Sequence, residues 1–84
     1  MASGTIKSNI RICTLGNFTI DANQYLAAGT LPQEYQGARA YIITAATNGA
    51  YLGGGVNEAN YEIYLFNNYS MQLTFGGVKV VCIY

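Results

Sequence analysis

Hydrophobic and polar residues alternate along most of the chain, with the period of two that is expected of strands that face a core on one side. The first predicted strand covers residues 5–15, where three isoleucines share one face and polar residues occupy the other. The isoleucines, which we expect to meet the core, are Ile6, Ile10 and Ile12. Gly16 and Asn17 then predict a turn, and a second strand follows from Phe18 toward Gly29.

A loop that crosses between two sheets is predicted around the single proline, Pro32. The loop begins near Gly29 and ends near Gly37, and its middle can hold one helical turn, because proline is favoured in the first turn of a helix. An alternative interpretation makes residues 24–39 a helix on an α+β sheet. The proline and the two glycines argue against this helix, because both residue types weaken a helix interior.

A hairpin is predicted in the middle of the chain. Residues 38–47 are rich in β-branched and aromatic side chains, and the Asn48-Gly49 pair after them is the strongest short hairpin signal. Residues 50–56 are therefore expected to return beside residues 38–47. Three consecutive glycines interrupt this returning strand, which predicts a bulge or the close approach of another backbone.

Three further strands are predicted in the last third of the chain, over residues 60–68, 70–75 and 78–84. Both faces of residues 60–68 are largely apolar or aromatic, so we expect this strand to be covered on both sides. Six or seven short strands separated by turn signals are typical of an all-β fold. The chain is therefore predicted to be a single domain over residues 1–84, an antiparallel β-sandwich or jelly roll.

The size and composition of the chain predict that it assembles with its own copies. A chain of 84 residues buries only about two-thirds of the surface that its unfolded form exposes. Its residues are 51% hydrophobic and 10% charged, against roughly 25% charged in ordinary soluble domains. A small core is usually stabilised by disulfides, by a metal or by oligomerisation. Because the chain has only two cysteines and no histidine, the first two are disfavoured and oligomerisation remains. The predicted interface residues, on the second apolar face of their strands, are Tyr64, Phe66, Val81 and Ile83.

The charge balance disfavours nucleic acid as a partner, because four basic and four acidic residues cancel and no run of either sign occurs. No apolar stretch approaches the roughly 20 residues of a membrane-spanning helix, so membrane insertion is not expected. The N-terminus lacks the pattern of a secretory signal, and synthesis in a bacterial cytoplasm is expected. Cys13 and Cys82, on the first and last predicted strands, are then expected to be buried free thiols, with a bridge between them as the alternative.

Catalysis is not predicted, because the chain has no histidine and its carboxylates are scattered. Glu58 and Glu62 are the nearest approach to a glycosidase pair, but they flank a predicted turn at Asn60. Two cysteines without histidine or a Cys-x-x-Cys pair do not make a metal site. We therefore expect no catalytic residues, no metal and no cofactor.

The high number of tyrosines is the feature of the sequence that most suggests a binding function. The chain has eight tyrosines and no tryptophan. Tyrosine combined with asparagine and glycine is typical of binding loops, although tyrosine is also a common strand residue that simply packs. The predicted ligand-binding residues, in the loops after Thr47 and Val56 and in residues 67–70, are Asn48, Tyr51, Asn57, Glu58, Asn60 and Tyr69. If these loops share one edge of the sandwich, they could bind a cell-wall sugar or teichoic acid.

The chain has a characteristic order of segments. It consists of residues 17–25 (NFTIDANQY), the proline loop, residues 35–43 (YQGARAYII) and a last strand at residues 78–84 (VKVVCIY). This order resembles the small C-terminal modules of tail-fibre and minor tail structural proteins of phages and prophages of Gram-positive gut bacteria. The likeness spans roughly residues 4–84 and is a pattern of strands and turns. It implies a β-sandwich, commonly a homotrimer, at the end of a virion appendage that touches the host envelope.

The expected function that follows from this resemblance is structural and adhesive, with contact to a host cell-surface polysaccharide. Many identical weak sites on one virion would then add up through avidity. Two alternatives stay open: a purely structural module that trimerises or caps a fibre, and a small bacterial lectin-like sandwich.

Overall fold

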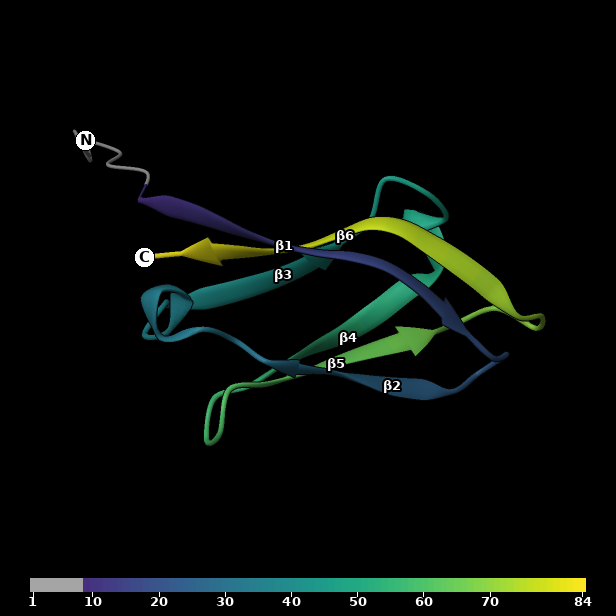
Figure 1. Cartoon of the computed structure of the whole chain (residues 1–84), viewed down its shortest axis with the longest axis horizontal. Coiled ribbons are helices and arrows are strands. Elements are labelled where there is room, and N and C mark those ends of the chain that lie inside the picture. The colour runs from purple at the N-terminus through teal and green to yellow at the C-terminus, as the bar shows by residue number, and fades with distance from the viewer. Residues whose placement is uncertain (1–8) are drawn as a thin grey trace, which may run out of the picture.

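Two layers of β-strand make up the fold in the computed structural model, which describes residues 9–84 (Figure 1). The six strands are β1 (Ile10–Ile20), β2 (Tyr25–Thr30), β3 (Ala40–Thr44), β4 (Leu52–Asn57), β5 (Glu62–Asn67) and β6 (Leu73–Ile83). Two short 3-10 turns, η1 (Gln33–Tyr35) and η2 (Gly49–Tyr51), lie in the connections. The prediction of an antiparallel β-sandwich with about six strands is confirmed.

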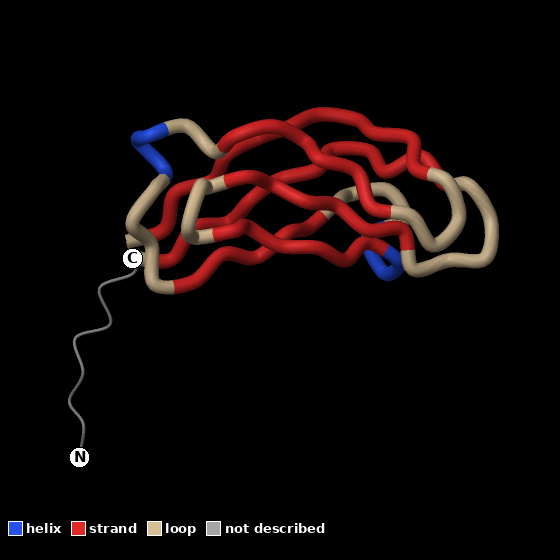
Figure 2. Tube along the Cα trace, turned by 90° about the horizontal axis from the view of Figure 1, so that it is seen from below, coloured by secondary structure: helices blue, strands red, loops and turns tan. Residues whose placement is uncertain are grey.

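Each layer is a three-stranded antiparallel sheet that is named here after its central strand. The β6 sheet has the order β1-β6-β3, and the β5 sheet has the order β2-β5-β4. Figure 2 shows that the strands run along the molecule and that the loops gather at its two ends. The fully buried hydrophobic side chains between the sheets are Leu31, Ile63, Leu65, Phe75, Val78, Val80 and Cys82.

The loop before β3 crosses from one sheet to the other, as the sequence predicts. β2 belongs to the β5 sheet and β3 to the β6 sheet, and η1 forms the predicted helical turn between them. Leu31 anchors the loop, because its side chain is fully buried and its N–H donates to the carbonyl oxygen of Tyr61 at 2.8 Å. The alternative helix over residues 24–39 is wrong, because β2 occupies Tyr25–Thr30.

The predicted hairpin around Asn48-Gly49 is wrong. β3 pairs with β6 and β4 pairs with β5, so this link passes between the sheets instead of joining two neighbours. A two-residue hairpin of the favoured type needs positive φ at both central residues. Asn48 has a left-handed conformation (φ 58°), but Gly49 begins the 3-10 turn η2.

β1 changes which of its positions face the core partway along its length. Cys13 is buried in the first half and Ile20 in the second, although an even alternation would put them on opposite faces. The pairing with β6 shifts register on both sides of Gly16, and this bulge inverts the alternation. The prediction that Ile10 and Ile12 face the core is therefore wrong, because they are 51% and 53% exposed.

Two glycine signals that predict breaks lie inside continuous strands. Asn17 belongs to β1, and its side-chain oxygen accepts a hydrogen bond from the N–H of Gly77 at 3.0 Å. Gly76 and Gly77 belong to β6, opposite the bulge of β1. Both glycine-containing pairs therefore bend two paired strands instead of ending them. Residues 5–8 of the first predicted strand, with Ile6, lie outside the described residues.

The close backbone approach predicted for the glycine run is confirmed at Gly54. A Cβ atom at this position would overlap the carbonyl oxygen of Tyr64 on β5. The pairing of β4 with β5 stays in register through all three glycines, so the run contains no bulge. β5 itself is buried on its inner face and half-buried on its outer face.

Cys13 and Cys82 lie on adjacent strands and are buried free thiols. Burial raises the pKa of both thiols, and the negative charge of Glu34 adds to the rise at Cys13. A raised pKa means less reactive thiolate at a given pH. At mildly alkaline pH, we expect a thiol reagent to label both residues at least about a hundredfold more slowly in the folded protein than in concentrated urea. Equal rates in stopped assays followed by mass spectrometry would contradict this expectation.

Candidate functional site

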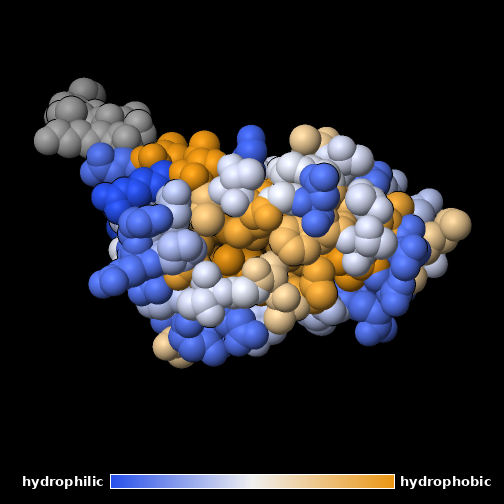
Figure 3. Space-filling view, viewed as in Figure 1, coloured by the Kyte–Doolittle hydropathy of each residue, from blue (hydrophilic) through white to orange (hydrophobic). Residues whose placement is uncertain are grey.

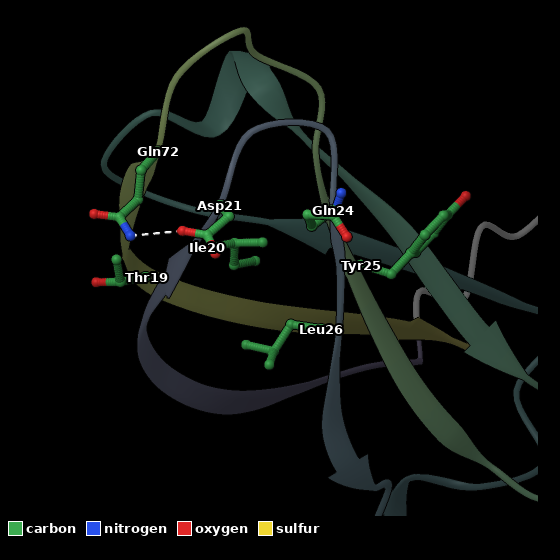
Figure 4. A pocket seen from close by; sticks show the side chains of 7 residues that line it. All are labelled: Thr19, Ile20, Asp21, Gln24, Tyr25, Leu26 and Gln72. Carbon is green, nitrogen blue, oxygen red and sulfur yellow. Dashed lines mark hydrogen bonds between the residues drawn. The ribbon is translucent and has the colours of Figure 1, made fainter.

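A depression of about 360 Å³ lies where the turn between β1 and β2 meets the beginning of β6 (Figure 4). This volume is in the range of small-molecule sites. The residues that line it come from the end of β1, the turn, the beginning of β2 and the segment before β6. They are Thr19, Ile20, Asp21, Gln24, Tyr25, Leu26 and Gln72.

Asp21 supplies the carboxylate of this site, and its orientation is held by Gln72. The side-chain nitrogen of Gln72 donates to Oδ1 of Asp21 at 2.7 Å, as the dashed line in Figure 4 shows. The backbone of Asp21 closes the turn, because its carbonyl oxygen accepts from the N–H of Gln24 at 3.2 Å. Asn23 takes the left-handed conformation that this tight turn needs (φ 57°). The carboxylate is therefore exposed but fixed.

The other lining groups combine neutral polar atoms with an apolar base. Ile20 is almost fully buried and Leu26 is half-buried, so both belong to the edge of the core. Thr19 is exposed, and its hydroxyl shares a hydrogen bond of 2.8 Å with the hydroxyl of Thr74. The Tyr25 ring points away from Asp21 and Gln72 in Figure 4, and it packs against the ring of Phe66.

Asn67 supports the depression from inside the sandwich. Its side chain is fully buried, and its amide nitrogen donates to the carbonyl oxygens of Ile20 and Met71, both at 2.9 Å. Its side-chain oxygen accepts from the N–H of Tyr69 at 2.9 Å. Asn67 thus fixes the end of β1 to the segment before β6. The sequence places Asn67 near the end of a predicted strand, where the alternation of Ile63 and Leu65 puts residue 67 on the inner face.

The six residues predicted to bind a ligand do not come together. Asn48, Tyr51 and Tyr69 lie before β4 and after β5, where the tilted rings of Tyr51 and Tyr69 pack with centroids 4.5 Å apart. Asn57, Glu58 and Asn60 lie in or beside the turn after β4. The six residues of β4 separate the two groups by roughly 20 Å.

The asparagines of the turn after β4 have a local structural role. The side-chain oxygen of Asn57 accepts from the N–H of Ala59 at 2.9 Å, and that of Asn60 accepts from the N–H of Glu62 at 3.0 Å. Asn48 likewise donates from its side chain to the carbonyl oxygen of Thr74 at 2.9 Å. These hydrogen bonds stabilise loops, which is the usual reason for asparagine in turns.

The four predicted interface residues lie on opposite sides of the sandwich. Tyr64 and Phe66 are on the outer face of the β5 sheet, and Val81 and Ile83 are on the outer face of the β6 sheet. All four side chains are half-buried. In Figure 3, hydrophobic side chains are visible along the middle of the molecule, and hydrophilic ones gather mostly toward its ends.

The depression contains one carboxylate among its lining residues, whereas glycoside hydrolysis ordinarily needs two. Across residues 9–84, no three His, Cys, Asp or Glu side chains are grouped so that they could hold a metal ion. Nor does this part of the chain form a helix with the length and apolar character required to cross a membrane.

Comparison of the chain with protein-family models, with curated proteins and with solved structures found no match.

Proposed function

We propose that the chain is a non-catalytic adhesion module of a phage tail or tail fibre, and that it binds a neutral glycan of the host surface in the depression beside Asp21. The observation that carries this proposal is a fixed, exposed carboxylate above an apolar base. Asp21 is held by Gln72, and Ile20 and Leu26 form the base.

The chemistry of the depression suits the hydroxyl groups and C–H faces of a sugar. A carboxylate accepts hydrogen bonds from hydroxyl groups, whereas the amides of Gln24 and Gln72 can both donate and accept. The apolar base offers a surface for the C–H groups of a sugar ring. None of the lining residues is basic, so the negative charge of Asp21 disfavours an anionic ligand such as the phosphate backbone of a teichoic acid.

The phage-tail context rests on the resemblance of residues 4–84 to tail modules described above. A tail carries its tip module in several copies, so a weak glycan site gains affinity through multivalency. A shallow depression with few polar contacts fits this mode of binding. A bacterial lectin-like sandwich would use the same depression and differs in its biological setting.

Replacement of Asp21 with alanine is expected to weaken glycan binding at least about tenfold, because a hydrogen bond to a charged group contributes about 1.5–3 kcal/mol. The test is a glycan array with the fluorescently labelled protein, followed by calorimetric titration of the best neutral glycan. The turn is expected to persist in this variant, because its hydrogen bond uses the backbone of Asp21 and not the side chain.

The matched control is Glu58→Ala, which removes an exposed carboxylate from the turn after β4. This variant is expected to bind the glycan like the unmodified protein. Loss of binding in Glu58→Ala with retention in Asp21→Ala would place the site among the loop residues predicted from the sequence. An array without any bound glycan would instead favour a purely structural module.

The purely structural function is the second candidate, because both sheets have apolar side chains on their outer faces. Ile10, Ile12 and Ile42 are about half exposed on the β6 sheet, and Tyr25 is 69% exposed on the β5 sheet. Surfaces of this kind are typical of contacts between protein chains.

A further inference from the structure

The outer faces of the two sheets have the same order of charged and apolar residues along their central strands. On each strand, one charged residue is followed by two apolar residues at every second position. These residues are Lys79, Val81 and Ile83 on β6, and Glu62, Tyr64 and Phe66 on β5. Residues two apart are about 6.6 Å apart along any strand, so the two series have the same spacing.

The charges of the two series are opposite. Lys79 is exposed and Glu62 is half-buried. Each has neutral polar neighbours on the flanking strands of its sheet. These neighbours are Thr14 and Thr44 beside Lys79, and Thr30 and Asn57 beside Glu62. No neighbour in these two rows therefore compensates either charge.

The relief of the two faces is also complementary. On the β6 sheet, Val81 is half-buried between Ile12 and Ile42, which are larger and about half exposed. On the β5 sheet the large side chain is on the central strand instead, because Tyr64 lies between Ala27 and Gly55. A Cβ atom on Gly55 would meet no other atom within 4 Å, so the space beside Tyr64 is open.

The outer face of the β5 sheet carries an aromatic ridge, formed by Tyr25, Tyr64 and Phe66, whose side chains are ordered by contacts within one chain. The rings of Tyr25 and Phe66 pack with centroids 4.5 Å apart. The interaction with the Glu62 carboxylate raises the pKa of the Tyr64 phenol. A ridge with ordered side chains loses less conformational entropy when it enters a groove than a ridge of mobile side chains does.

We propose that the outer face of the β6 sheet of one copy packs on the outer face of the β5 sheet of the next copy, with Lys79 opposite Glu62 and Val81 opposite Tyr64. The partner is a second copy of this chain, because each face carries the charge and the relief that the other lacks. The contact is head-to-tail, so it generates a closed ring or an open filament of copies and not a symmetric dimer.

Contact of the β6 sheet with its own counterpart in a symmetric dimer fits less well. In such a pairing, Lys79 would meet either a second Lys79 or the aliphatic part of the opposite face. The first arrangement brings like charges together and the second buries a charge without a partner, and both are unfavourable. The same argument applies to Glu62 on the β5 sheet.

The test measures the solution mass by light scattering over a range of protein concentrations, for the unmodified chain and for charge-reversed variants. The mass of the unmodified chain is expected to rise above that of two copies. Lys79→Glu and Glu62→Lys alone are each expected to raise the dissociation constant at least about tenfold, because like charges then meet at the contact. An equimolar mixture of the two variants, and the double variant, are expected to return to within about threefold of the unmodified chain.

The control variant Glu34→Lys makes the same change of net charge as Glu62→Lys, but on the exposed 3-10 turn η1, and is expected to leave association unchanged. If a charge-reversed variant does not fold, Lys79→Gln and Glu62→Gln replace the pair and are expected to weaken association to a smaller degree. A mass of one chain at all concentrations would overturn the proposal. So would a mass that stops at two chains, or a Glu62→Lys variant that associates as well as the unmodified chain.

Discussion

Replacement of Gly54 with alanine is expected to lower the free energy of unfolding by at least about 3 kcal/mol. Gly54 has a φ of 119°, which residues with a side chain rarely adopt, and a Cβ atom there would overlap the carbonyl oxygen of Tyr64. Because the obstacle is backbone, β4 must move away from β5 and lose hydrogen bonds of the β5 sheet. Thermal unfolding followed by circular dichroism is expected to show a midpoint at least about 12 °C lower.

Gly55→Ala is the matched control for this prediction. The neighbouring glycine does not have a positive φ, and its Cβ atom would have open space. Its replacement is expected to change the free energy of unfolding by less than about 1 kcal/mol, since alanine also reduces the freedom of the unfolded chain. Equal losses in the two variants would show that the strand is sensitive to any side chain and that the contact with Tyr64 is not the cause. Both variants are compared at a concentration where the chain is monomeric.

Replacement of Asn67 with leucine is expected to lower the free energy of unfolding by about 3 kcal/mol. Leucine has a similar size, so the variant removes hydrogen bonds without leaving a large cavity. The carbonyl oxygens of Ile20 and Met71 would lose their donor, and the N–H of Tyr69 would lose its acceptor. A buried polar group left without a partner costs about 1–3 kcal/mol. Urea unfolding followed by circular dichroism measures the difference.

Asn60→Leu serves as the control for the buried amide. Asn60 also accepts a backbone hydrogen bond, from the N–H of Glu62 at 3.0 Å, but it is exposed in the turn after β4. Water can replace this bond, so the expected loss is below about 1 kcal/mol. If Asn67→Leu were no more destabilising than Asn60→Leu, the tie between the end of β1 and the segment before β6 would contribute little to stability.

Strands of the second half of the chain could be predicted from the sequence, because alternation is a local property of the chain. The strand predicted from Phe18 toward Gly29 is wrong, because β1 ends at Ile20 and a turn over residues 21–24 precedes β2. Residues 60–68 predict β5, and residues 78–84 predict the second half of β6 with its correct inner face. Val80 and Cys82 are fully buried there, as the alternation requires. Pro32 and its flanking glycines predict the crossing loop for the same reason, since they act on their own segment.

The pairing of the strands could not be predicted in the same way. The Asn48-Gly49 signal describes a local turn, whereas β3 pairs with β6, the last strand of the chain, and β4 pairs with β5, the strand that follows it. Hydrogen bonds along β5 and β6, which are the central strands, decide these positions. The inversion of β1 at Gly16 is also a joint property of two strands, because the bulge exists only where β1 meets β6. Ile10 and Ile12 were therefore predicted on the wrong face.

The depression beside Asp21 depends on segments that are about 50 residues apart, since Gln72 donates to Asp21. Neither residue carries a recognisable motif, and no local pattern links them. The predicted binding loops fail to form one site for the opposite reason. Their residues share a composition typical of binding loops, but the length of β4 keeps them at separate ends of the sandwich.

By itself, the sequence determined the all-β class and the crossing loop, because alternation and the chemistry of proline and glycine act locally. Its composition also determined that the chain has more apolar residues than one small core can bury. Only the tertiary structure decided which faces are outside, which strands are neighbours, and that Lys79 and Glu62 lie on opposite outer faces. These features depend on bulges and strand pairings between distant segments, whose free energy is gained only when the two sheets are assembled.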